Sequence, residues 1–139
     1  MNVIVCVDDH GGVLFNQRRQ SRDQILIEDM LGMLEAVGGK LWIAPFSEKL
    51  MKPYMENRPN ITVDEEYCTK AESEDFCFVE NGALKDWEEK IDAVIVYRWN
   101  RVYPADTYLD IDLSGWQLVS TGEFSGASHE KITKEVYRK

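Results

Sequence analysis

The chain has 139 residues, of which 44% are hydrophobic, and its 25 acidic side chains outnumber 16 basic ones to give a formal net charge of −9. This length and composition predict one domain, residues 1–139, with a sizeable buried core. The negative charge argues against binding to extended nucleic acid or to anionic membrane surfaces. No apolar run approaches the roughly 20 residues of a membrane span, and no signal peptide pattern is present, so we expect a cytoplasmic protein.

The first half of the sequence alternates predicted strands and helices. Ser21 and Gln24 have the spacing of a capping box, and the apolar residues that follow recur at i, i+3, i+4 and i+7, which predicts a helix ending at Gly38 and Gly39. A short second helix is expected to start with Ser47 as its cap. The strands predicted in this half are Asn2 to Val7, Leu41 to Ala44 and Ile61 to Val63.

The second half continues the same alternation. Phe76 to Val79 is a predicted strand, and Leu84, Trp87 and Ile91 mark the buried face of a helix. The unbroken apolar run from Ala93 to Val96 predicts a central strand with both faces covered. Strands that alternate with helices indicate a largely parallel sheet between helical layers.

Cysteine and histidine are too few and too scattered for a metal centre. Cys6, Cys68 and Cys77 are odd in number and lack Cys-x-x-Cys spacing, so neither a disulfide framework nor a zinc site is predicted. Two-zinc hydrolysis of the ribonuclease Z kind needs a His-x-His-x-Asp-His cluster, which two distant histidines, His10 and His129, cannot supply. We interpret His129 as a turn or strand-edge residue.

Two segments resemble dihydrofolate reductases: MNVIVCVDDHGGVLFN at the start, and IDAVIVYRWNRVYPADTYLDIDLSGW from Ile91 to Trp116. Gly11 to Asp23 lies where that family has its flexible substrate loop, and PADTYLDID where it has an acidic Asp-Thr turn. The resemblance implies a three-layer α/β fold, with a central, mostly parallel sheet, helices on both faces and an antiparallel C-terminal strand pair.

The C-terminal segment can be interpreted in two ways. Ser128 to Lys139 alone has a helical pattern, with a serine cap and with Ile132 and Val136 four residues apart. The resemblance makes Thr133 to Arg138 a strand antiparallel to Gln117 to Thr121. We predict the strand, because a sheet edge left unpaired at Trp116 to Thr121 would be a liability.

The family's two NADPH phosphate sites are altered in this chain. A Gly-Gly pair that lets backbone approach a phosphate corresponds to Glu80, Asn81 and Gly82, and a Gly-Arg-x-Thr sequence corresponds to Ala44 to Ser47. A carboxylate at Glu80 adds repulsion, and Pro45 removes an amide donor. We therefore expect no cofactor; NADPH belongs only to the alternative in which substituted contacts hold it. The vestigial positions are Ala44, Ser47, Glu80, Asn81 and Gly82.

The family's catalytic acid on the first helix also lacks a counterpart, since Ile25 or Leu26 takes its place. Asp23, Glu28 and Asp29 are the remaining candidates for that role, of which Asp23 and Glu28 are retained. The alternative roles are structural: Asp23 interacts favourably with the helix dipole in the first turn, and Glu28 and Asp29 lie on the solvated face.

A set of cations with neighbouring polar and aromatic groups provides the candidate ligand site. Arginine forks bind phosphate or carboxylate, and an aromatic ring can stack on a ligand ring. The alternative is that the arginines pair with surface acids and that the tryptophan is core. The candidates are Arg18, Arg19, Arg22, Arg98, Trp99, Asn100 and Arg101.

Three functions are consistent with these patterns. The favoured one is a reductase-like fold without NADPH-dependent activity that binds a small anionic or nucleotide-like molecule in a vestigial cleft. The alternatives are a divergent NADPH-dependent dihydrofolate or pterin reductase, and a protein-interaction module that forms a homodimer through a strand edge.

Overall fold

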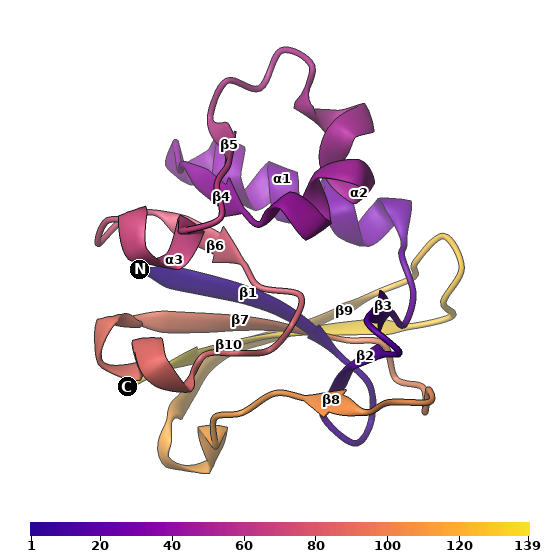
Figure 1. The fold of residues 1–139 in the computed structure, drawn as a ribbon. Coiled ribbons are helices and arrows are strands. Elements are labelled where there is room, and N and C mark those ends of the chain that lie inside the picture. Colours follow the sequence, from indigo (N-terminus) through magenta and orange to yellow (C-terminus); the bar gives the residue numbers. More distant parts are fainter.

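The apolar runs form one seven-stranded sheet in the computed structural model, which describes residues 1–139 (Figure 1). The strands, in sheet order, are β5 (Ile61–Val63), β4 (Leu41–Ile43), β6 (Phe76–Phe78), β1 (Asn2–Val7), β7 (Ala93–Arg98), β10 (Ile132–Arg138) and β9 (Gln117–Phe124). The first five are parallel to one another, whereas β10 is antiparallel to both β7 and β9. The predicted mostly parallel sheet with an antiparallel C-terminal pair is confirmed.

Two helices cover one face of the sheet (Figure 1). In α1 (Gln24–Val37), the apolar positions three and four residues apart are buried, and Gly38 ends the helix in a left-handed conformation with φ 66°. The predicted serine caps are wrong at both helices. Asp23 caps α1, whereas α2 (Pro45–Met55) begins at a proline, which places Ser47 inside the helix. Ala44 precedes α2 and is not part of β4.

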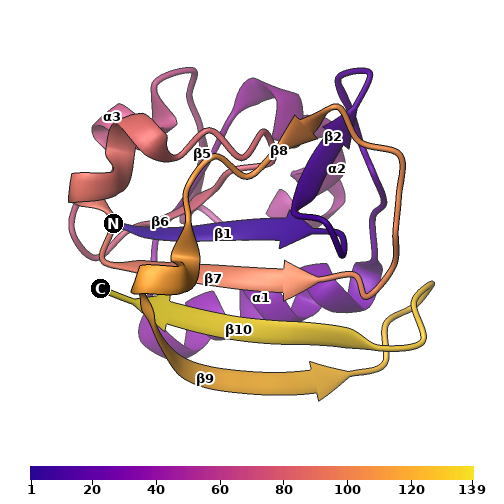
Figure 2. The same ribbon diagram turned by 90° about the horizontal axis from the view of Figure 1, so that it is seen from below.

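Shorter elements cover the opposite face (Figure 2). They are α3 (Tyr67–Lys70), the 3-10 helices η1 (Lys85–Lys90) and η2 (Leu113–Gly115), and a small sheet of β2 (Gly12–Phe15), β3 (Arg18–Arg19) and β8 (Thr107–Tyr108). The α-helix expected between Leu84 and Ile91 is thus a 3-10 helix flanked by these two buried residues. The expected substrate loop is a hairpin that turns at Asn16 and Gln17, both of which have positive φ.

Alternation along the strands assigns side chains to the two layers. In β7, Ile95 and Tyr97 face α1, and Trp99, just beyond the strand, continues this row, whereas Val94 and Val96 belong to the opposite core. In β10, Ile132 and Val136 likewise face the α1 layer. Their four-residue spacing also fits a helix, but in a strand residues an even number of positions apart point to the same face, so the two side chains lie together here as well. The helical alternative for the C-terminal segment is therefore wrong.

None of the helices combines the length and the apolar composition that a membrane crossing requires.

Candidate functional site

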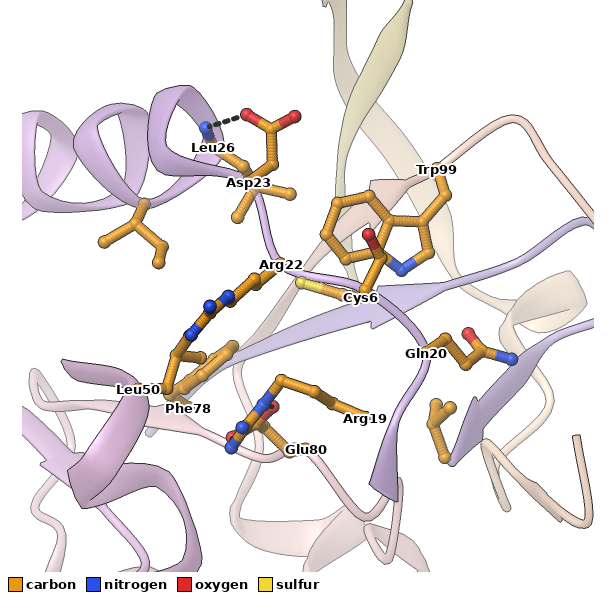
Figure 3. A pocket seen from close by; sticks show the side chains of 13 residues that line it. Cys6, Arg19, Gln20, Arg22, Asp23, Leu26, Leu50, Phe78, Glu80 and Trp99 are labelled. Atoms are coloured by element: carbon orange, nitrogen blue, oxygen red, sulfur yellow. Dashed lines mark hydrogen bonds and ion pairs between the residues drawn. The ribbon is translucent and has the colours of Figure 1, made fainter. Parts of the chain in front are cut away.

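A pocket opens at the carboxyl ends of the central parallel strands, under the first turns of α1 and α2 (Figure 3). This end of a parallel sheet is where α/β proteins commonly place their ligands. The interior cavity is small, about 20 Å³, which is space for about one water molecule. Its lining residues are Cys6, Val13, Arg19, Gln20, Ser21, Arg22, Asp23, Leu26, Ile27, Leu50, Phe78, Glu80 and Trp99.

The pocket walls are largely apolar. Leu26 and Ile27 come from α1, Leu50 from α2, and Phe78 and Trp99 from the ends of β6 and β7. Cys6 adds a neutral thiol, because burial and, to a lesser extent, the charge of Glu80 raise the pKa of Cys6 well above its usual range. A planar apolar group would therefore contact hydrocarbon and aromatic surface on several sides.

The polar rim is organised around Glu80, whose side chain is only 9% exposed. Its carboxylate accepts two parallel bonds from Arg19, at 2.7 Å from Nε and 2.9 Å from Nη2, and a third from the Ser47 hydroxyl at 2.7 Å. Hydrogen bonding to Glu80 raises the pKa of Arg19, although its partial burial acts in the opposite direction. Arg19 is thus committed to an internal carboxylate, at the amino end of α2 where an external anion would otherwise be favoured.

A second carboxylate that is bonded within the chain, Asp110, is exposed and lies at the start of η1. Its Oδ1 accepts hydrogen bonds from the backbone amides of Leu84 at 2.7 Å and Lys85 at 2.9 Å. Nearby, Gly82 has φ 65°, and a Cβ added there would lie 3.1 Å from the Leu109 Cα and the Tyr108 carbonyl oxygen. The amides and the glycine at this turn therefore face the chain itself. Asn81 likewise bonds within the turn, to the amide of Ala83.

Asp23, the remaining candidate for a catalytic acid, is buried and accepts hydrogen bonds from two segments, the start of α1 and the β9–β10 connection. Its Oδ1 receives the amides of Ile25, Leu26 and Ala127 at 3.0, 3.3 and 2.8 Å. Its Oδ2 receives the Ser128 amide at 2.9 Å and contacts His129 Nδ1 at 3.0 Å. Burial alone would raise the pKa of Asp23, but these hydrogen bonds outweigh it and hold the pKa well below its ordinary value.

His129 extends this network away from the pocket. It is 3% exposed, its Nε2 lies 2.8 Å from the Tyr103 hydroxyl, and its ring stacks on Trp99 with centroids 4.5 Å apart. The expectation of a turn or strand-edge role did not foresee this burial between a carboxylate and a phenol. Tyr103 and Asp110 were also missed, because no local sequence pattern distinguishes them.

The structure brings together only part of the predicted cation set. Arg19, Arg22 and Trp99 line the pocket, and Arg22 is exposed and forms no ion pair within the chain (Figure 3). Arg98 lies on the opposite face of β7, where its Nε bonds Glu135 at 2.5 Å. Arg98 is therefore not part of this pocket.

The other candidates lie outside the pocket. Asn100 and Arg101 follow β7. Asn100 donates to the Thr133 hydroxyl at the start of β10, and Arg101 donates to the Ser128 carbonyl oxygen in the β9–β10 connection. Arg18 is exposed on β3. Glu28 is exposed and bonded to Gln24. No three side chains of His, Cys, Asp or Glu are grouped so that they could hold a metal ion.

Comparison with known proteins identifies the architecture. No protein-family model matches the chain, and no curated protein matches it. Among solved structures, the chain is similar to dihydrofolate reductase from Enterococcus faecalis complexed with NADP(H) and RAB-propyl, with a TM-score of 0.61 and 15% sequence identity. The match covers 99% of this chain and 95% of that one. The chain therefore has a dihydrofolate reductase-like fold.

Proposed function

We propose that this protein binds a small, planar, anionic molecule of nucleotide-like character in the pocket between α1, α2 and the sheet, and that it does not catalyse NADPH-dependent reduction. The observation that carries the proposal is the Asp110 carboxylate on the amides of Leu84 and Lys85. Together with Glu80, it fills positions where a dinucleotide phosphate would need open backbone.

The cost of displacing Asp110 can be estimated from its two bonds. Both bonds end on one oxygen of an exposed side chain, so each contributes about 0.5–1.5 kcal/mol and freeing both amides costs about 1–3 kcal/mol. A penalty of that size lowers affinity by about one to two powers of ten. At the second position, an incoming phosphate would also compete with Glu80 for Arg19 and Ser47. The solved neighbour is complexed with NADP(H), but the residues of this chain do not fit that cofactor.

The chain also lacks a suitable proton donor in the pocket. Asp23 is held ionised by its hydrogen-bond donors, because they favour the charged form. Glu28 is exposed and does not line the pocket. A reductase that must protonate a heterocycle at this place would have no acid available, which further supports a binding function.

Two features favour a ligand that has both a ring and an anionic group. They are the apolar walls of the pocket and the unpaired guanidinium of Arg22 at its mouth. Arg22 borders both this pocket and a neighbouring cavity that also includes Lys49. An unpaired guanidinium binds phosphate or carboxylate with two parallel bonds, while Trp99 and Leu50 contact the ring. Because the cavity is small, we expect the Arg19 to Arg22 segment to move outward when a ligand enters.

Thermal stability in the presence of defined compounds tests the proposal. Adenosine monophosphate (AMP) should raise Tm, whereas adenosine and inorganic phosphate, which carry the ring and the charge separately, should raise it less. At a free AMP concentration of 100 times Kd, binding raises the free energy of unfolding by about 2.7 kcal/mol. Arg22→Gln should abolish most of the AMP shift. Arg18→Gln, a change of the same kind at an exposed arginine outside the pocket, is the matched control.

Activity measurements address the alternative directly. We expect no dihydrofolate-dependent oxidation of NADPH by the purified protein. Turnover above the uncatalysed rate would establish the divergent reductase and overturn the proposed function.

One observation favours a second function, homodimer formation through β9. This eight-residue strand forms an edge of the sheet, and Leu118 and Val119 are 47% and 45% exposed. An exposed edge without proline or lysine can pair with the same edge of a second copy. Light scattering should then give a dimer mass that Val119→Lys reduces to the monomer mass, while Val37→Lys, at an exposed valine on α1, has no effect. A monomer mass for the unmodified protein would contradict this function.

A further inference from the structure

Three side chains next to Trp99, which lines the pocket, form a continuous hydrogen-bonded chain. Asp23 Oδ2 lies 3.0 Å from His129 Nδ1, and His129 Nε2 lies 2.8 Å from the Tyr103 hydroxyl. Asp23 and His129 are almost fully buried, at 2% and 3% exposure, and Tyr103 is half-buried. A carboxylate, an imidazole and a hydroxyl in this order is an arrangement in which a proton can be held and shifted.

The hydrogen-bond partners determine which atom can gain or lose a proton. The four backbone amides on Asp23 can only donate, so its carboxylate remains an acceptor and His129 Nδ1 must carry a hydrogen. The remaining position is Nε2. When Nε2 is bare, it accepts from the Tyr103 hydroxyl; when it is protonated, it donates, and the phenol hydrogen must turn away. Proton uptake therefore switches the direction of one hydrogen bond.

The surroundings of the imidazole can compensate a positive charge. Asp23 faces the ring from the amino end of α1, Ser128 lies beside it in the β9–β10 connection, and Trp99 stacks on it at 4.5 Å and 26°. A cation against the face of a tryptophan is favoured. Tyr103 approaches the ring from the β7–β8 connection. A basic group, Arg101, bonds the carbonyl oxygen of the neighbouring residue Ser128 at 3.3 Å. No second carboxylate contacts the ring.

This network is joined to the pocket through two of its members. Asp23 and Trp99 both line the pocket, and Arg22, the cation at its mouth, directly precedes Asp23 in the chain. A negative charge placed beside Arg22 favours the positively charged form of a histidine behind this wall. Because coupling between two sites is reciprocal, a proton on the histidine then favours the anion equally.

We propose that Asp23, His129 and Tyr103 form a buried site for one proton, and that proton uptake at His129 is coupled to anion binding in the pocket. The coupling rests on the proposed function, whereas the proton site itself does not. Binding should tighten when His129 takes up its proton, and an anion should enter together with a fraction of a proton.

Nuclear magnetic resonance of the imidazole nitrogens tests the proton site in the free protein. His10 is exposed and is the only other histidine, so His10→Asn leaves His129 as a single reporter. In a scan from about pH 8 to about pH 5, Nδ1 should stay protonated throughout, while Nε2 should gain a proton on acidification. Tyr103→Phe, which keeps the ring but removes the hydroxyl, should change this titration. A bare Nδ1, or an Nε2 whose protonation does not change in this scan, overturns the proposal.

AMP binding as a function of pH tests the coupling. Between about pH 8 and pH 5.5 the affinity of the unmodified protein should rise about fivefold more than that of His129→Gln, which is at the low end of known coupling strengths. The comparison removes the titration of the phosphate of AMP, which lies near pH 6. Equal pH dependence in the two proteins overturns the coupling. Absence of AMP binding at every pH overturns the proposed function and the coupling with it, and the free-protein titration then decides the proton site alone.

Discussion

Replacement of Asp23 by asparagine should destabilise the protein through a specific mismatch of donors. The side-chain oxygen of the introduced asparagine could still accept the amides of Ile25, Leu26 and Ala127, which all bond Oδ1. The new amide nitrogen would face the Ser128 amide and His129 Nδ1, which both bond Oδ2 in the native protein. One buried N–H is then orphaned, and the histidine must change its tautomer. A lost charge-assisted bond and an unsatisfied buried amide together cost about 2–4 kcal/mol.

Urea denaturation of Asp23→Asn at several pH values measures this effect. The pKa of Asp23 is lowered in the folded state, so its stabilisation is present above the pKa of an unfolded aspartate, about 3.9, and is lost as the pH falls further. The difference between the native protein and Asp23→Asn should therefore shrink as the pH falls below about 4. Glu28→Gln, at an exposed acid on the same helix, should change stability by no more than about 0.5 kcal/mol. A loss under about 1 kcal/mol at neutral pH would refute the reasoning.

Three further substitutions test other parts of the structure. Glu80→Gln should cost about 1–3 kcal/mol in chemical denaturation, because a neutral amide cannot accept both bonds of Arg19; an unchanged midpoint would contradict the internal ion pair. Gly82→Ala should cost about 1 kcal/mol or more, since φ is 65° and the added methyl group meets backbone at 3.1 Å, and thermal unfolding would reveal a neutral change if the turn were open. Arg98→Ala should leave the Tm shift with AMP unchanged, because Arg98 bonds Glu135 on the far face of the sheet; loss of that shift would contradict the location of the pocket.

The parallel strands and the helices α1 and α2 could be predicted from local signatures, whereas β10, whose local pattern also fits a helix, was predicted from the family resemblance. The run from Ala93 to Val96 forms part of β7, and the glycine at position 38 ends α1. Alternation along β7 could also have separated Arg98 from Trp99, since adjacent residues of a strand point to opposite faces. The cap of α1 was less accessible, because Ser21 and Asp23 both suit a helix start.

Contacts between distant segments could not be predicted in this way. Asp23 acquires most of its significance from Ala127, Ser128 and His129, which are 104 to 106 positions away in the sequence. Asp110 likewise reaches amides 25 and 26 residues earlier. Local patterns carry no information on such pairs. The substitutions at the positions that match the family's cofactor motifs were visible in the sequence, whereas the carboxylate of Asp110 on the amides of Leu84 and Lys85 was not.

Crystal structures of the protein soaked separately with AMP and with NADPH test the central claim most directly. We expect the AMP ring against Trp99 and Leu50 with its phosphate on Arg22, and we expect Asp110 to remain on the amides of Leu84 and Lys85 in both crystals. A pyrophosphate of NADPH bound to those two amides, with Asp110 displaced, would contradict the account.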